Sequence, residues 1–477
     1  MRPLLLALGL AVPAFVHAQN QSLTRADSML VGRMLRAEDR RDSSDVALVE
    51  GARHTSARVR LLARRARARI VDPLFTARDS FASLPAPPSW PEPAWRMRYR
   101  ELTTRRDDCA TLRTALSDTM WPVRLHAADL ARASCAGDDT LVATLRAWLD
   151  SLPGDVSRRA RGSVSWHAAA HGIVALARLR PDEARSRIGV LADHEQWHLR
   201  LYAARAATVL RDTARLRMFA RDSNENVTEA AITALAGLTG HADDDLYIAA
   251  LESGGAQAVR AAALALDGSP RADARAAANA AFERWVERGN ASERDVRVAL
   301  LAAAGRPESD DRPPSRRGEL PLDAIRLALG RDVRLRITTT RSSGGGAFIV
   351  RLRGDVAPVM AGRILALVRD GYYDGLTWHR VEHDFVIQGG SPGDNEYVGH
   401  PVYIRDELGT VPHVRGTVGM STRGHDTGDA QWFINLKDNP RLGGAYTVFA
   451  EVIEGIDVVD GILEGDTIER IVEVGYP

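Results

Sequence analysis

The spacing of apolar residues along this chain changes a little beyond residue 305. From about Ser22 to Gly305, alanine, leucine and arginine dominate, and apolar residues recur at intervals of three and four, the period of one helix face. Farther on, Val333–Ile337 and Phe348–Leu352 alternate at period two, as half-buried β-strands do. A helical spacing returns from Met360 to Val368. The pattern predicts a helical N-terminal region and a β-rich C-terminal domain that carries a helix.

A short phrase recurs within the helical region, in each case with alanine close behind it. It reads Val59-Arg60-Leu61, Val123-Arg124-Leu125, Leu199-Arg200-Leu201, Val227-Thr228, Val259-Arg260 and Val296-Arg297. The later copies follow one another at roughly 30 residues, a period typical of stacked helical pairs, and the earlier gaps are close to two such units. We therefore predict a HEAT-like α-solenoid over residues 22–305, with an irregular helical bundle as the alternative. Arrays of this kind expose a long curved surface for contacts.

A proline-bearing stretch separates the two regions. Arg306-Pro307, Pro313-Pro314 and Leu320-Pro321 interrupt the helical spacing. The sequence thus predicts a linker over residues 306–330 and a second domain over residues 331–477.

The first residues have the features of an export signal. Met1-Arg2 gives a positive start, an apolar stretch runs from Leu4 to Val16, and Val16-His17-Ala18 offers a small-residue cleavage site before Gln19. The apolar stretch is too short for a stable membrane anchor. We predict a signal peptide at residues 1–18 and a periplasmic or secreted protein without stable membrane insertion.

Cysteine usage agrees with export. Cys109 and Cys135 are the two cysteines of the chain. An even count in an exported protein favours a disulfide between them, and two buried thiols are the alternative.

The charge balance gives no basis for nucleic-acid binding. Lysine and arginine number 63 and aspartate and glutamate 62, so the formal net charge is +1. Local arginine-rich stretches are more typical of a solvated helix face than of a nucleic-acid site.

Candidate chemistry is concentrated between Trp378 and Asn435. The segments are Trp378-His379-Arg380-Val381, Asp384-Phe385-Val386-Ile387-Gln388-Gly389-Gly390 and Gln431-Trp432-Phe433-Ile434-Asn435. They supply an arginine, two carboxamides and large apolar side chains, without a nucleophile, a metal-ligand cluster or a phosphate loop. Such a site can bind and polarise, and it requires no cofactor.

That combination suits rotation about an X-Pro peptide bond, whose barrier of roughly 18–20 kcal/mol comes from amide resonance. Arg380 could donate to the prolyl nitrogen, which favours the twisted amide over the planar one. Gln388 could donate to the preceding carbonyl oxygen. Phe385, Phe433 and Leu442 would then form an apolar floor for the pyrrolidine ring.

These residues resemble the cyclophilin-type peptidyl-prolyl isomerases over about the last third of the chain. The markers follow the family's order: Ala347-Phe348-Ile349-Val350, Ala357-Pro358, the Trp378 and Phe385 segments, Gly416-Thr417-Val418-Gly419-Met420, the Gln431 segment, and Tyr446-Thr447-Val448-Phe449. The resemblance implies a closed β-barrel with two capping helices and Arg380 as the catalytic arginine. It also implies a set of substrate-binding residues: Phe385, Val386, Gln388, Ser421, Thr422, Gln431, Phe433, Leu442, Tyr446 and Phe449.

Several positions depart from the family pattern. Trp378 and Trp432 replace phenylalanines, Thr422 an asparagine, Ser391 an aspartate and Tyr446 a histidine. Arg441 stands where cyclosporin-sensitive members have tryptophan, which implies weak inhibition by that drug. The alternative function is a chaperone or scaffold that binds proline segments without turning them over.

A rival motif lies in the helical region. His194-Glu195-Gln196-Trp197-His198 matches H-E-x-x-H, which binds zinc when both histidines share one helix. Trp197 aligns with Trp121, where Pro122 marks a helix start, so we expect His194 in the preceding turn. We predict no metal site, and a zinc hydrolase at His194 and His198 is a remote alternative.

The sequence therefore predicts an exported peptidyl-prolyl isomerase that assists folding of extracytoplasmic proteins. Its partners would be proline-containing polypeptides, and its helical repeats would bind these clients or another protein.

Overall fold

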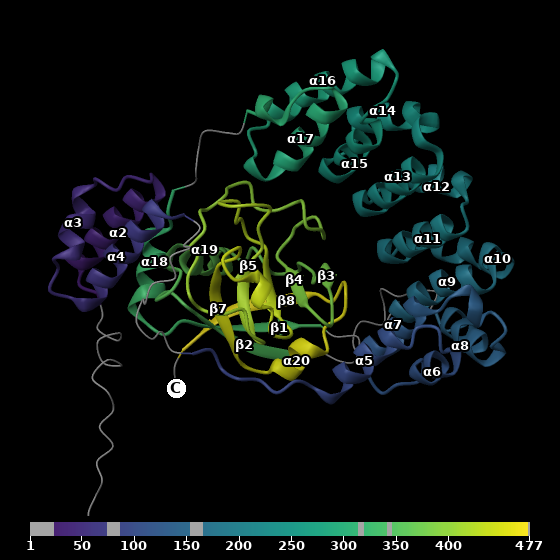
Figure 1. Cartoon of the computed structure of the whole chain (residues 1–477), viewed down its shortest axis with the longest axis horizontal. Coiled ribbons are helices and arrows are strands. Elements are labelled where there is room, and N and C mark those ends of the chain that lie inside the picture. Colours follow the sequence, from purple (N-terminus) through teal and green to yellow (C-terminus); the bar gives the residue numbers. More distant parts are fainter. Residues whose placement is uncertain (1–22, 74–85, 153–165, 313–318, 341–345, 476–477) are drawn as a thin grey trace, which may run out of the picture.

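The computed structural model describes residues 23–73, 86–152, 166–312, 319–340 and 346–475. These form a helix-rich N-terminal region and a β-rich C-terminal domain (Figure 1). The signal peptide predicted at residues 1–18 lies outside the described residues. Within the described ranges, every helix is too short or too polar to cross a bilayer.

Helices account for most of the N-terminal region. They are α2 (Arg25–Asp39), α3 (Val46–Ala52), α4 (Ala57–Val71), α5 (Ala94–Thr104), α6 (Cys109–Ala115), α7 (Trp121–Leu130), α8 (Asp139–Asp150), α9 (His167–Leu179), α10 (Pro181–Ala192), α11 (Trp197–Val209), α12 (Thr213–Phe219), α13 (Glu225–Thr239), α14 (Asp244–Ser253), α15 (Ala256–Leu266), α16 (Ala272–Glu287) and α17 (Arg294–Ala303). Short 3-10 helices lie between them: η1 (Ala133–Cys135), η3 (Gly240–Asp243), η4 (Ala291–Glu293) and η5 (Glu308–Asp310).

From α8 to α17 the helices stack as pairs. Each odd-numbered helix packs on the even-numbered one before it, and α7, α9, α11, α13, α15 and α17 pack one against the next. Short polar caps start many of them; Asp138, Asp212 and Asn224 accept hydrogen bonds from the first-turn backbone of α8, α12 and α13. The recurring phrase falls on α4, α7, α11, α13, α15 and α17, and α9 fills the gap between α7 and α11 without it.

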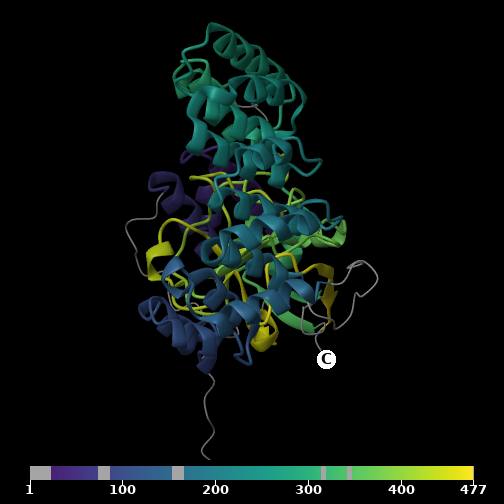
Figure 2. The ribbon, with the colours of Figure 1, turned by 90° about the vertical axis from the view of Figure 1, so that its right-hand side faces the viewer.

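The array of helices from α5 to α17 curves around the β-rich domain (Figure 1), and Figure 2 shows it stacked in front of that domain. Its inner edge contacts the domain through a series of hydrogen bonds and ion pairs: Arg96 Nη2 to Asp460 Oδ1 at 3.0 Å, Tyr202 Oη to Glu464 Oε2 at 2.9 Å, Asn226 Nδ2 to the Gly393 carbonyl at 3.0 Å, and Arg423 Nε to Asp295 Oδ2 at 2.6 Å. Part of the curved surface expected to be free for partners thus faces the chain's own C-terminal domain.

The first helices belong with the C-terminal domain rather than with the array. Buried residues of α2–α4, such as Met34, Leu48 and Val59, share one apolar core with α18 (Leu322–Gly330) and the β-sheet, whereas the core of the array begins at Trp95. This differs from the single helical domain expected over residues 22–305. The predicted linker over residues 306–330 is not a plain connection, because it contains η5 and α18. Helix α18 packs closely on α19 (Pro358–Arg369) at Gly362.

A buried charge network joins α2 and α4 to the C-terminal domain. Arg405 is fully buried, and its Nη2 forms an ion pair with Glu38 Oε2 at 3.0 Å. From α4, Arg69 Nε donates to the Leu408 carbonyl at 2.9 Å and Nη2 to the Glu407 carbonyl at 3.0 Å. Because removing one member would leave an uncompensated buried charge, this network fixes the position of the first helices.

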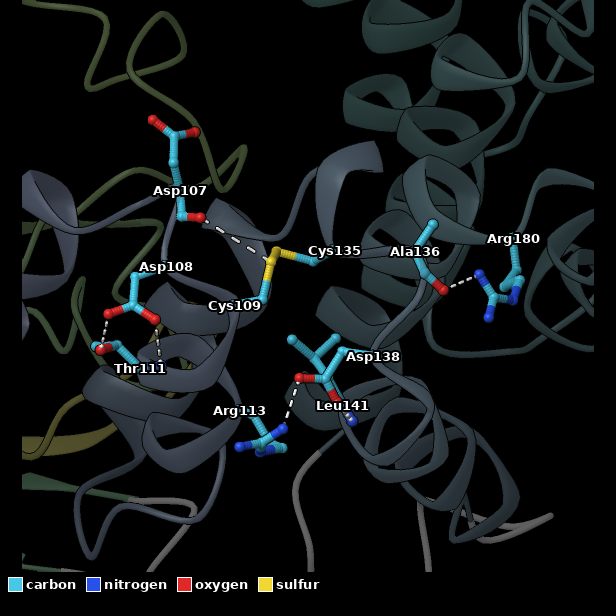
Figure 3. Close-up of a disulfide and its surroundings, with 10 residues drawn as sticks. All are labelled: Asp107, Asp108, Cys109, Thr111, Arg113, Cys135, Ala136, Asp138, Leu141 and Arg180. Carbon is cyan, nitrogen blue, oxygen red and sulfur yellow. Dashed lines mark hydrogen bonds and ion pairs between the residues drawn. A yellow bond between two sulfur atoms is a disulfide. The ribbon is translucent and has the colours of Figure 1, made fainter.

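In the structure Cys109 at the start of α6 is bonded to Cys135 in η1 (Figure 3). The bond closes a loop with a sequence separation of 26 residues and ties α6 to the segment ahead of α8. Nearby, Arg113 Nη1 donates to Asp138 Oδ2 at 2.8 Å (Figure 3). Restricting the unfolded chain in this way contributes about 3 kcal/mol in the chain-entropy account.

The C-terminal domain is built on an antiparallel sheet in the order β3-β4-β6-β5-β7-β2-β1-β8. The strands are β1 (Arg334–Thr339), β2 (Gly346–Leu352), β3 (Arg380–Val381), β4 (Val386–Gly389), β5 (Thr417–Met420), β6 (Trp432–Asn435), β7 (Val448–Glu454) and β8 (Ile468–Val474). The helices α19 (Pro358–Arg369) and α20 (Ile456–Asp460) pack on it, and η6 (Pro440–Leu442) precedes β7. The predicted strands at residues 333–337 and 348–352 and the helix at 360–368 are confirmed within a few residues.

The sheet is a curled half-barrel, which corrects the expected closed barrel. The edge strands β3 and β8 form no ladder with each other; the segments ahead of them meet through an isolated bridge between Thr377 and Thr467. Backbone hydrogen bonds join residues 375–378 to residues 465–468, for example from Trp378 N to the Asp466 carbonyl at 2.9 Å, but they do not continue as a regular ladder into β3, which spans only Arg380 and Val381.

Histidines are buried where the array meets the C-terminal domain. His167 Nε2 lies 2.6 Å from the Glu464 carbonyl oxygen, His198 stacks on Trp166 with ring centroids 4.5 Å apart, and His383 meets the Trp95 ring edge-on. Burial lowers the pKa of His167 to about 3, that of His198 to about 4 and, with help from Arg96, that of His383 to about 3.

Mild acid should therefore destabilise the fold. In the unfolded chain the pKa of histidine is about 6.5. Below that pH the unfolded chain therefore binds protons that the buried histidines of the folded chain do not bind. Stability is fully present above about pH 6.5 and falls below it, by up to about 1.4 kcal/mol per pH unit for each buried ring. Thermal unfolding between about pH 7.5 and 5.5 checks this, and His167→Gln should make the slope shallower. An unchanged Tm across this range would contradict the prediction.

Candidate active site

The candidate site begins with one row of residues across four strands. Arg380 pairs with Gln388, Gln388 with Phe433, and Phe433 with Gly419. Directly paired residues of antiparallel strands point to the same face of a sheet. The adjacent row, Val381, Ile387, Ile434 and Val418, points to the opposite face, and its last three members are buried in the core. The arginine, the carboxamide and the phenylalanine thus share the face that is turned away from that core.

An apolar cluster separate from the main core lies on this face. Val386, Phe433 and Leu442 form it, and the half-buried Phe385 and Tyr446 pack against it. The Tyr446 ring meets the Phe433 ring edge-on, with centroids 5.6 Å apart. The structure therefore brings together five of the predicted substrate-binding residues.

Gly419 makes room for this cluster. A Cβ atom at this position would lie 2.4 Å from Cζ of Phe433, a distance that no side chain tolerates. The glycine lets the phenylalanine ring lie flat across β5, so its requirement here is steric.

Phe449 is not part of the cluster, which corrects its assignment to the site. It lies on β7 and belongs to the main core, with 1% of its surface exposed. Phe449 was assigned to the site because it shares a sequence motif with Tyr446, but its side chain packs in the core inside the curled sheet.

Arg380 lies beside the cluster and is held by two carboxylates. Its Nε donates to Glu382 Oε1 at 2.8 Å and its Nη1 to Glu396 Oε1 at 2.5 Å, while Nη2 also contacts Glu382. Cζ lies 6.0 Å from the centroid of the Phe385 ring. A guanidinium has five N–H donors, so these contacts leave one N–H on each Nη for another acceptor. Burial alone would lower the pKa of Arg380, but the two carboxylates outweigh it and raise the pKa, which keeps the side chain charged.

The two predicted carboxamides are buried and bond to each other. Gln388 Nε2 donates to Ser421 Oγ at 2.9 Å and to Gln431 Oε1 at 3.1 Å. Gln431 Nε2 donates in turn to the carbonyl oxygens of Glu396 and Val398, at 3.2 and 3.1 Å. Their expected role was to bond substrate directly; here they link β4, β5 and the loop that carries Glu396. Thr422 is half-buried next to Ser421 at the end of β5.

Sequence reasoning missed some neighbours of the site. Glu382 follows Arg380 at the period-two spacing of a strand, which could have placed it on the same face. Glu396 comes from a loop, and no local pattern points to it. Arg441 was noted as a departure, and its guanidinium lies 4.3 Å from the centroid of the Phe385 ring. His413 stacks on Phe433 with centroids 5.9 Å apart.

His379, next to Arg380, does not act as an acid partner. Burial, together with the Arg380 charge, lowers its pKa to about 3, so the ring is neutral at neutral pH. The departures Trp378 and Trp432 are core residues whose rings meet edge-on at 5.1 Å.

The H-E-x-x-H residues do not share one helix. As predicted, His194 lies ahead of α11, which begins at Trp197 after the N-cap residue Gln196. His198 packs between the rings of Trp166 and Trp197, at 4.5 and 3.7 Å between centroids. In the described ranges, no group of three or more potential ligand side chains is placed to hold a metal ion.

Comparison with known proteins places this geometry in a family. The family model described as cyclophilin type peptidyl-prolyl cis-trans isomerase/CLD matches residues 334–474. A peptidyl-prolyl cis-trans isomerase of Helicobacter pylori is 39% identical over 120 residues, which cover 24% of this chain and 74% of that protein. Peptidyl-prolyl cis-trans isomerase B of Bacillus subtilis is 34% identical over 129 residues, 27% of this chain and 90% of that protein.

A solved structure of a Cryptosporidium parvum cyclophilin aligns with 31% of this chain and 100% of its own, at 25% identity and a TM-score of 0.29. The family-model match begins and ends within the C-terminal domain, where Arg380, Gln388 and Phe433 form their row. The chain therefore belongs to the cyclophilin-type peptidyl-prolyl cis-trans isomerases, and residues 334–474 are its isomerase domain.

Proposed function

We propose that Arg380 is the catalytic residue and that the apolar cluster receives the proline ring of the client. The observation that carries this proposal is the position of a charged guanidinium beside Phe385, Phe433 and Leu442, on one face of the sheet. The pyrrolidine ring would rest on the cluster, where its burial removes apolar surface from water.

Catalysis then requires only that the twisted amide be bound more tightly than the planar one. As the bond rotates, the prolyl nitrogen loses its conjugation and gains a lone pair that can accept a hydrogen bond. A free N–H of Arg380 would donate to that lone pair, an interaction that the planar amide cannot match. No bond is broken and no proton is transferred, which agrees with a neutral His379 beside the arginine.

The two carboxylates would act by orienting Arg380. A long, flexible side chain loses rotamer freedom when it binds substrate, and Glu382 and Glu396 have already removed much of that freedom. Gln388 and Gln431 support the same arrangement, because Gln431 bonds to the backbone of the Glu396 loop.

A second candidate function is a holdase that binds proline segments without rapid turnover. The observation that favours it is the engagement of three guanidinium nitrogens by carboxylates, which lowers the number of donors left for an amide. Turnover measured on variants of Arg380 distinguishes the two functions.

For the rest of the chain we propose a HEAT-like α-solenoid that brings clients to the isomerase domain. The stacked pairs from α8 to α17 and the repeated phrase support this assignment. We also propose that the chain is exported, as its first residues suggest, and that it assists folding of extracytoplasmic proteins. The disulfide is compatible with an oxidising compartment.

Replacing Arg380 tests the catalytic proposal. We expect Arg380→Ala to lower kcat/KM for a proline peptide about 100-fold, equivalent to about 2.7 kcal/mol of transition-state stabilisation. Two-dimensional NMR exchange spectroscopy on the full chain measures the rate without a coupling protease. Arg470→Ala, which replaces an exposed arginine on β8, is the matched control. Unchanged turnover in Arg380→Ala would refute the assigned role.

The pH dependence of turnover tests the same assignment. Wild-type turnover should be flat from about pH 6.5 to 8.5, because arginine does not titrate there.

Removing the charge of Glu396 tests the orienting role. Glu396→Gln preserves the size of the side chain but removes its charge, which weakens the hydrogen bond that Arg380 Nη1 donates to it. We expect kcat to fall about ten-fold with little change in KM, since alignment matters most in the transition state. The same NMR assay checks this, with Glu382→Gln as the matched variant on the other side of the guanidinium. A faster variant would mean that the carboxylate restrains the arginine instead of aligning it.

Processing of the N-terminus tests export. We expect the mature protein to begin at Gln19, because the proposed cleavage site ends at Ala18. Intact-mass analysis of the protein from its native cell measures this directly. A mature chain that retains residues 1–18 would argue against export by this route.

A further inference from the structure

A cleft of about 670 Å³ lies between the array and the isomerase domain. Its array wall comes from α11 and α13, including Leu201, Ala230 and Thr233, and its other wall comes from β3 and the loop at residues 394–397. In Figure 1 the inner ends of α11 and α13 face β3 and β4 across this region. Neither part of the chain forms the cleft alone.

The cleft is continuous with the candidate active site, because Arg380 lines both. Its guanidinium borders the cleft and lies 6.0 Å from the Phe385 ring of the apolar cluster. Successive Cα atoms are about 3.8 Å apart, so a client with its proline on the cluster reaches the cleft within about two or three residues.

Contacts across the floor of the cleft keep its two walls together. Asn395 Nδ2 donates to Asn226 Oδ1 at 3.1 Å, and Asn226 Nδ2 donates to the Gly393 carbonyl at 3.0 Å. The guanidinium of Arg260 on α15 lies 3.5 Å from the centroid of the Tyr397 ring. The loop that carries Glu396 is thus held by α13 and α15, which pack against each other in the array.

The charges around the cleft are mostly negative. Glu229, Asp394, Glu396 and Glu464 line it, against Arg205 and Arg380. Arg260 neutralises Glu229 at 2.7 Å, but Glu382 adds a further negative charge on Arg380. Five carboxylates therefore face three guanidinium groups. Burial raises the pKa of Glu229, and Arg260 offsets only part of that rise.

We propose that this cleft is a subsite for the client residues that flank the proline, and that it favours lysine or arginine there over aspartate or glutamate. The inference rests on the proposed function, in that the same polypeptide occupies the cluster and the cleft. The array would then set client selectivity as well as delivery. The exposed hydroxyl of Thr233 supplies a further hydrogen-bonding group in the cleft.

Matched peptides test the subsite. Each contains one proline, with lysine or glutamate placed two and three residues before it or after it, and an uncharged peptide serves as reference. For the full chain, kcat/KM by NMR exchange and Kd by NMR titration are measured side by side. We expect lysine to be favoured about five-fold over glutamate on the flank that enters the cleft, and the preference to shrink in high salt. Equal values for lysine and glutamate on both flanks would overturn the proposal.

Charge variants of Thr233 assign the effect to the cleft. Thr233 is exposed on α13, so its replacement should not disturb the core. Thr233→Arg should abolish or reverse the lysine preference, and Thr233→Glu should increase it. Val190→Arg places the same charge on α10, at a side chain that is 69% exposed and outside the cleft, and should keep the wild-type ratio. A ratio that is the same in all four proteins would also overturn the proposal.

The design separates this inference from the proposed function. Turnover of the uncharged peptide reports on the isomerase alone. If turnover is absent, the Kd values still measure the charge preference, so the cleft is tested in either case.

Discussion

The register between β3, β4, β6 and β5 is the constraint on which the candidate site depends. It aligns Arg380, Gln388, Phe433 and Gly419 in one row. A slip of one residue would turn Arg380 into the core and bring Ile387 and Ile434 to the surface, because side chains alternate along a strand. The burial of Ile387, Ile434 and Val418 opposes that slip. The packing of the domain and the placing of its chemistry are therefore consequences of the same pairing.

The array and the isomerase domain are more closely joined than two domains on a linker. Polar contacts from α5, α11, α13 and α17 reach the domain, and several of them end on loops near Arg380. Glu396 illustrates the effect. Its carboxylate holds the arginine, while its neighbours Asn395 and Tyr397 are held by α13 and α15. The geometry of the arginine thus reflects contacts from outside the family's own domain.

The sequence allowed part of this to be predicted, for physical reasons that differ between elements. Arg380, Gln388 and Phe433 lie in contiguous motifs that the sequence shows directly, but the register that brings them to one face joins three separate strands. His194 was placed in a turn because Trp197 aligns with a helix start. The periodicity of apolar residues shows which face of an element is buried, but it does not show which other element covers that face. The packing of α2–α4 on the isomerase domain could therefore not be predicted from the sequence. Glu396 was missed because its position depends on a loop fixed by distant helices, and Phe449 was misplaced because a motif gives proximity along the chain only.

The burial of α2–α4 against the last third of the chain has a consequence for synthesis. Arg69 donates to the carbonyl of Leu408, 339 positions farther along, and Glu38 meets Arg405 in the same network. Helices α2–α4 are synthesised long before the C-terminal strands on which they pack. Until those strands are made, Met34 and Leu48 lack part of their final apolar neighbours. Contacts of such long range slow folding and prolong the exposure of apolar surface. The completion of this chain's own early helices therefore depends on one of the longest loop closures that its length permits.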